Sequence, residues 1–202
     1  MSFRNAMLIA IAVSALSAPA FAQESGAGTN NAADVQRDVN QQQRIEQGLQ
    51  SGQLTTKEAG QLERQQQHVD KMEQNADRNG SISPAEQSRI NAAQNKASAS
   101  IYADKHNGVT GNSESKSSER MQADVQRNVN QQQRIENGVQ SGSLTNHEVG
   151  SLERGQAHVN RTEANAAADG HVGAHEQARI QGKENFQSGR VYNKKHNGRV
   201  RQ

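Results

Sequence analysis

Val39-Asn-Gln-Gln-Gln-Arg-Ile-Glu46 is repeated ninety residues later as Val129-Asn-Gln-Gln-Gln-Arg-Ile-Glu136. The same offset relates Ala33–Gly108 to Ala123–Gly198 without a gap, and roughly half of the aligned positions are identical. The chain is therefore a tandem duplication. Residues that both copies share are those that the common fold needs, whereas residues that differ are free or specialised.

Each copy shows three stretches of apolar residues at helical spacing. In the first copy these positions are Val35, Val39, Gln42, Ile45 and Leu49, then Leu62, Val69, Met72 and Ala76, then Ile90, Ala93, Ala97 and Ile101. Breaks with glycine separate the stretches at Ser51-Gly52 and Asn79-Gly80. The pattern predicts an all-α fold of two tandem three-helix domains.

The segments that flank and join the two repeats are polar, which indicates where the domains begin and end. Residues 109–122 are rich in Ser, Gly, Asn and charge, so we expect a flexible linker between a helical repeat at 33–108 and a second one at 123–198. We expect residues 23–32 to be disordered and residues 199–202 to form a basic tail.

The first residues have the features of a secretory signal peptide. Arg4 precedes an apolar run at 6–16, and Ala20-Phe21-Ala22 supplies the small residues of a cleavage site, which predicts a signal peptide at 1–22. The apolar run is too short to span a bilayer, so we expect a periplasmic or secreted product without membrane insertion. Cysteine is absent, which excludes disulfides, thiolate metal sites and cysteine nucleophiles.

The composition predicts a thin core and excludes several function classes. Only 31% of the residues are hydrophobic and 2% are aromatic. We therefore expect a bound ion, docking of the two copies or a protein partner to help to stabilise the fold. The 23 basic residues are balanced by 21 acidic ones, which argues against a nucleic-acid partner. No catalytic set or cofactor fingerprint is present, so we do not expect an enzyme.

A motif of the form Gly-x-aliphatic-x-x-x-Glu occurs four times. It starts at Gly52, Gly80, Gly142 and Gly170 and ends at Glu58, Glu86, Glu148 and Glu176. Gly, an aliphatic residue and Glu stand at positions 6, 8 and 12 of the twelve-residue calcium loop. In this respect the chain resembles the EF-hand superfamily. The paired glycines are 28 residues apart, a short spacing similar to that of lanmodulin-like proteins, so that one helix would serve two loops.

The resemblance implies one weak calcium site, in the second loop. Its oxygen-bearing side chains fall at the ligand positions of the family, and the implied ligands are Asn75, Asp77, Asn79, Ser81, Ser83 and Glu86. Only two of these carry formal charge, so the expected dissociation constant is roughly 0.1 to 1 mM. The other three loops lack the ligand pattern.

The same residues are also explained without a metal. Ser83-Pro-Ala-Glu86, Thr55-Thr-Lys-Glu58 and Thr145-Asn-His-Glu148 fit the capping box, in which the hydroxyl and the Glu satisfy free amides at a helix start. A metal-free periplasmic adaptor or chaperone-like protein is therefore the alternative function.

Histidines of the second copy give a third hypothesis, the handling of a transition metal. His171 and His175 are four residues apart, and His147, His158 and Asp169 lie in the same copy. Surface histidines are the simpler explanation of the pattern, so this hypothesis ranks below the other two. The sequence thus predicts an exported helical protein with a calcium-type site and a structural or interaction role.

Overall fold

Six α-helices form the fold. The structure, a computed structural model, describes residues 27–199, and within that range it contains no strand. The helices are α1 (Ala27–Gln50), α2 (Thr56–Ala76), α3 (Pro84–Lys105), α4 (Lys116–Gln140), α5 (Asn146–Ala166) and α6 (Ala174–Lys195), and the short 3-10 helix η1 (Asp77–Asn79) follows α2. The prediction of an all-α fold with three helices in each copy is confirmed. The expected signal peptide at 1–22 and residues 200–202 of the expected tail lie outside the described residues.

The helix starts show the predicted capping boxes. Thr55, Ser83 and Thr145 each accept a hydrogen bond from the amide three residues later, and the Glu at that position accepts one from the cap amide. The glycine at each turn takes a left-handed backbone conformation, for example φ 82° at Gly80. Helix α2 therefore lies between two glycine turns and serves both motifs of its copy.

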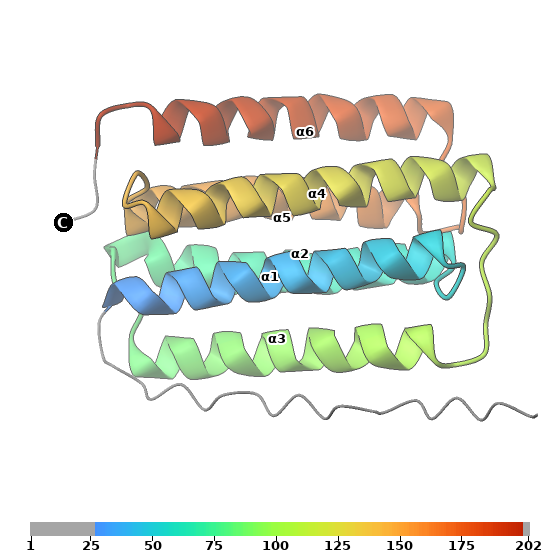
Figure 1. Cartoon of the computed structure of the whole chain (residues 1–202), viewed down its shortest axis with the longest axis horizontal. Helices are drawn as coiled ribbons and strands as arrows, with labels where there is room; N and C mark the ends of the chain where they lie inside the picture. Colours follow the sequence, from blue (N-terminus) through green and yellow to red (C-terminus); the bar gives the residue numbers. More distant parts are fainter. Residues whose placement is uncertain (1–26, 200–202) are drawn as a thin grey trace, which may run out of the picture.

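The helices lie side by side along one direction, as Figure 1 shows. Helices α1 and α2 of the first copy pack against α4 and α5 of the second, and α3 and α6 cover the two outer sides. The four inner helices form a bundle to which both copies contribute equally.

The two copies approach each other most closely where α2 crosses α5. A Cβ atom added to Gly60 would lie 2.6 Å from the Cβ atom of Ala167, and one added to Gly150 would lie 2.6 Å from that of Asp77. Gly60 and Gly150 are equivalent residues of the repeat, as are Asp77 and Ala167. The copies are thus related by an approximate two-fold axis, like the subunits of a dimer.

The apolar core is also shared between the copies. One cluster joins Leu49 and Leu62 to Val125 and Ile180, and a second one joins Val35 to Val139 and Leu152. Neither copy completes these clusters alone. The prediction of two EF-hand-like domains joined by a flexible linker is therefore not confirmed.

Two segments differ from their expected state. Helix α1 begins at Ala27, inside the segment expected to be disordered, and the buried Asn31 side chain donates hydrogen bonds to Asp77 and Asn146. Helix α4 begins at Lys116, inside the expected linker, and buries Met121. The connection before it donates a backbone hydrogen bond from Gly111 to Gly52 at 2.8 Å. Contacts with the other copy order both segments.

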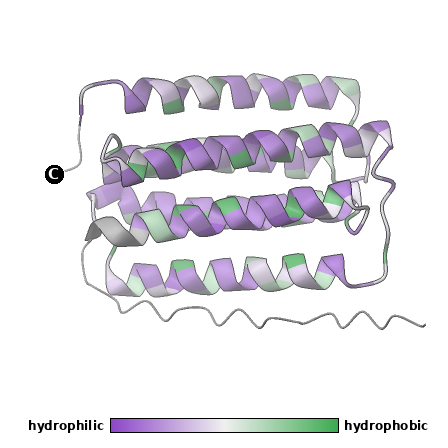
Figure 2. Cartoon of the chain, viewed as in Figure 1, coloured by the Kyte–Doolittle hydropathy of each residue, from purple (hydrophilic) through white to green (hydrophobic). Residues whose placement is uncertain are grey.

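The apolar clusters lie toward the ends of the bundle, and a polar layer lies between them. Figure 2 shows that the apolar residues form only short patches on otherwise hydrophilic helices. Within residues 27–199, no helix is both long and apolar enough to cross a membrane.

Candidate metal centre

The interior of the bundle contains acidic side chains without basic ones. Thirteen of the 21 Asp and Glu residues are buried, whereas no Lys or Arg among the described residues is. Residues 27–199 contain two ion pairs, Lys116–Glu119 and Arg127–Glu184, and only the second reaches a buried carboxylate. Charged groups are costly to bury unless they are paired, protonated or bound to a metal.

Four of these side chains form what we call the carboxylate cluster: Asp38 of α1, Asp70 and Glu73 of α2, and Glu153 of α5. One oxygen from each of the four lies within 4.8 Å of the others. Three helices from both copies therefore meet at this cluster. Asp70 and Glu73 are three residues apart on α2, a spacing that places both side chains on the same helix face.

Amide side chains hold the cluster from outside. Gln94 of α3 donates to Asp38 Oδ1 at 3.0 Å and to Glu73 Oε1 at 3.1 Å. Asn160 of α5 donates to Asp70 Oδ2 at 2.8 Å, and Gln132 of α4 donates to Glu153 Oε2 at 3.2 Å. Each of the four carboxylates thus has one oxygen held by an amide, and the second oxygen of most of them accepts no such bond.

Several oxygens at this place accept no hydrogen bond while the carboxylates are ionised, whereas Asp38 and Glu73 share one when either of them is protonated. The oxygens without a bond are Asp38 Oδ2, Glu73 Oε2, Glu153 Oε1 and, beside the cluster, Asn31 Oδ1. Buried oxygens of this kind are uncommon in folded proteins, and each requires a physical explanation. A cation, which accepts oxygen lone pairs, supplies one.

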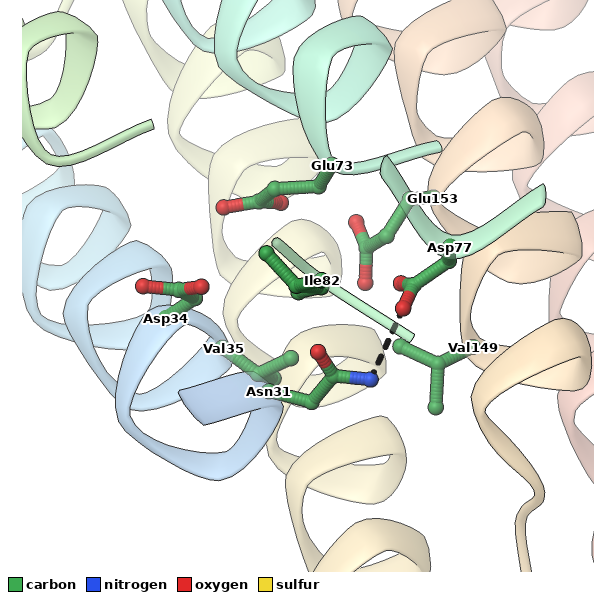
Figure 3. A pocket seen from close by; sticks show the side chains of 8 residues that line it. All are labelled: Asn31, Asp34, Val35, Glu73, Asp77, Ile82, Val149 and Glu153. Carbon is green, nitrogen blue, oxygen red and sulfur yellow. Dashed lines mark hydrogen bonds between the residues drawn. The ribbon is translucent and has the colours of Figure 1, made fainter. Parts of the chain in front are cut away.

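A small cavity adjoins the carboxylate cluster. Its lining residues include Asn31, Asp34, Glu73, Asp77 and Glu153, and Figure 3 shows these side chains around Ile82, with Val149 beside them. The cavity leaves about 10 Å³ for the centre of a water-sized sphere, enough for about one water or ion. Carboxylate groups and an amide side chain thus lie beside a cavity of this size.

Burial strongly favours the protonated form of these acids. Burial, reinforced by the neighbouring carboxylates, raises the pKa of Asp70 and Glu73 well above its usual range, and burial also raises that of Glu153. Burial likewise raises the pKa of Asp38 to about 7 and that of Asp34 to about 6. A cation would compete with these protons, because metal ligands must be deprotonated.

The second copy has lost the equivalent cluster. Asn128 and Asn160 stand where the first copy has Asp38 and Asp70. Asn128 donates to Glu163 Oε2 at 2.8 Å, so an amide satisfies the carboxylate there. Asn160 faces Asp70, its own equivalent across the two-fold axis. The carboxylate cluster therefore lies on one side of the axis, although the second copy also buries acids such as Asp124, Glu163 and Glu184.

The structure gives the predicted ligands of the second loop different local contacts, although Asn75 and Glu86 line one surface pocket. Asp77 is buried and lies at the interior cavity, where its Oδ1 accepts from Asn31 at 2.9 Å. Asn75 is exposed, and Asn79 Oδ1 accepts from the Ser81 amide at 3.2 Å. Glu86 Oε2 accepts from the amide and hydroxyl of Ser83 at the start of α3. Of the predicted ligands, Asp77 reaches the cavity, while Ser83 and Glu86 form a helix cap.

The histidines of the second copy do not form a comparable group. Among the described residues, the carboxylate cluster is the one set of three or more His, Asp or Glu side chains close enough to share an ion. His171 and His175 are exposed, and the His171 amide donates to Asp169 at 2.8 Å. The geometry gives no support to the transition-metal hypothesis.

The sequence contained a signal for the cluster that spacing alone did not identify. Glu63 and Asp70 of α2, and Asp77 at the start of η1, each directly follow a buried apolar residue of the helix stripe. Such acids are usually exposed at the edge of an amphipathic face. They are buried here because α5 covers that edge, which is a tertiary contact that the sequence of one copy does not show.

The chain matches no family model, no curated protein and no solved structure among the known proteins.

Proposed function

We propose that the protein is an exported cation-binding protein whose carboxylate cluster holds one hard divalent cation between the two copies. The observation that carries the proposal is the meeting of Asp38, Asp70, Glu73 and Glu153 in a site where no described Lys or Arg is buried. All donors at the site are oxygens, which favours calcium, magnesium or manganese over softer metals.

Such an ion would have a structural role as well. Glu153 belongs to the second copy and the other three carboxylates belong to the first, so one ion would join both. An ion bound only to the folded state adds stability, by roughly 2.7 kcal/mol at one hundred times its dissociation constant. For a chain of this size that corresponds to a rise in melting temperature of roughly 5 to 10 °C.

The loop at residues 75–86 is the alternative binding site for a calcium-type ion. The resemblance to EF-hand proteins supports it, whereas the use of Glu86 in a helix cap weighs against it. The two sites have no charged ligand in common, although Asp77 of the loop lines the cavity beside the carboxylate cluster. They are therefore separable by substitution.

The deciding experiment is a calorimetric titration of the chelator-treated chain with calcium, magnesium and manganese at pH 8. The double variant Asp38→Asn, Asp70→Asn copies the residues that the second half already uses, and we expect it to lose binding while it remains folded. Glu86→Gln preserves a capping-box residue, because Gln also serves there. It should bind the ion as the wild type does.

The opposite result would move the site to the loop. If Glu86→Gln loses binding and the double Asn variant retains it, the ion sits at residues 75–86. If the wild type binds none of the three cations, the metal-free adaptor or chaperone-like function replaces this proposal.

A further inference from the structure

A groove with a basic rim lies between α2 and α3, on the outside of the first copy. It has a volume of about 480 Å³. Arg64 and His68 of α2 and Arg89 and Lys96 of α3 contribute its polar groups, while Met72 and Ala93 belong to its apolar part. We call this feature the basic groove. It is separate from the carboxylate cluster, which lies in the interior of the bundle.

Among the described residues, the cations of the basic groove form no salt bridge. Neither ion pair within residues 27–199 includes Arg64, Arg89 or Lys96. Hydrogen bonds from the Ser83 hydroxyl and amide, and to a smaller extent the charge of Arg89, lower the pKa of Glu86. That carboxylate keeps its negative charge in the helix cap and offsets part of the charge of Arg89, but it does not line the basic groove.

The charge distribution of the whole chain strengthens the field at this groove. Most acidic side chains are buried while no described Lys or Arg is, so basic side chains dominate the exposed charge of residues 27–199. The formal net charge of +2 conceals this separation. A concave site lined by one sign of charge attracts ligands of the opposite sign.

We propose that the basic groove binds a small amphiphilic anion, with its phosphate, sulfate or carboxylate group held by Arg64, Arg89 and Lys96. Met72 and Ala93 would contact the apolar body of the ligand, since binding pockets combine an apolar wall with a few placed polar groups. Arg matches oxyanions with two parallel donors, and Lys adds a point charge.

The second copy provides an internal control for this groove. Its counterpart between α5 and α6 encloses about 180 Å³. Phe186 stands there in place of Lys96, and it is 70% exposed. Arg179, the equivalent of Arg89, does not line that pocket. The proposal therefore predicts one site per chain, in the first copy.

The test is a fluorescence titration of the full chain with naphthalene-1-sulfonate. The fluorescence of the ligand can be followed because the chain contains no Trp. Inorganic sulfate and the neutral naphthalene-1-methanol are tested as competitors. We expect saturable binding of one sulfonate per chain and weak competition by either part alone. The variant Arg89→Gln, Lys96→Gln should bind about tenfold more weakly, as expected for the loss of two charge contacts.

The matched control is Arg179→Gln, Lys183→Gln, which removes two exposed cations from the second copy and should leave the affinity unchanged. Equal losses in both double variants would show a general attraction to a basic surface and overturn the proposal. So would the absence of saturable binding, or equal binding of the neutral compound. Circular dichroism of each variant verifies that the helices are retained.

Discussion

Single residues determine whether a buried acid of this protein is protonated, accepts a hydrogen bond from an amide or binds an ion. Asp38 and Asp70 of the first copy correspond to Asn128 and Asn160 of the second. Replacing one carboxylate oxygen by an amide nitrogen changes each side chain from a cation ligand into a hydrogen-bond donor. The sequence revealed this asymmetry, but not that the two sets of residues face each other.

Outside the carboxylate cluster, Glu63, Asp124 and Glu184 make stability depend on pH. Burial raises the pKa of Glu63 and of Glu184 to about 8, and that of Asp124 to about 7. In the unfolded chain such groups titrate near 4. Their contribution is therefore fully present below about pH 4 and is lost as the pH rises through 7 to 8.

Glu184→Gln should remove part of this pH dependence, because the first copy has Gln94 at the equivalent position. At pH 9 we expect the variant to be more stable than the wild type by roughly 1 to 3 kcal/mol. At pH 5 the advantage should vanish. Urea unfolding of both proteins in chelator at the two pH values measures the difference, and an equal effect at both would refute the assignment.

At the scale of helices, the sequence predicted the elements well and their partners poorly. Three helices per copy, the glycine turns and the capping boxes all follow from local patterns. The sequence also indicated that a thin core needs further stabilisation, and named docking of the copies as one source. It could not identify α2 and α5 as the docked pair, because the glycines that permit this contact resemble ordinary helix glycines.

Alanine substitutions at Gly60 and Gly182 distinguish the effect of close helix packing on stability from the effect of helix propensity. Both lie inside helices, but a Cβ atom at Gly60 would meet Ala167 at 2.6 Å, whereas one at Gly182 would meet nothing within 4 Å. Gly182→Ala should therefore stabilise the protein by about 0.5 to 1 kcal/mol. Gly60→Ala should destabilise it by about 1 to 3 kcal/mol through overpacking.

Denaturant unfolding of both variants at one pH gives the comparison. If Gly60→Ala were stabilising to the same extent as Gly182→Ala, α2 and α5 would not be in contact in solution. The two copies would then be separate domains, as the polar linker composition suggested.

At the scale of the whole molecule, the fold resembles a dimer fused into one chain. Apolar clusters toward both ends of the bundle join the copies, and a polar layer lies between them. Fusion allows the two halves to differ. Here the first half keeps the carboxylates and the basic groove, while the second half supplies amides and Glu153.

The central claim is that a cation binds inside the bundle, and the most direct measurement is anomalous X-ray scattering from crystals grown with manganese at pH 8. We expect one anomalous peak within about 2.0 to 2.6 Å of carboxylate oxygens from Asp38, Asp70, Glu73 and Glu153. Crystals of the Asp38→Asn, Asp70→Asn variant should lack it. A peak bound by Glu86 in the loop, or no peak in the interior of the wild type, would contradict the account.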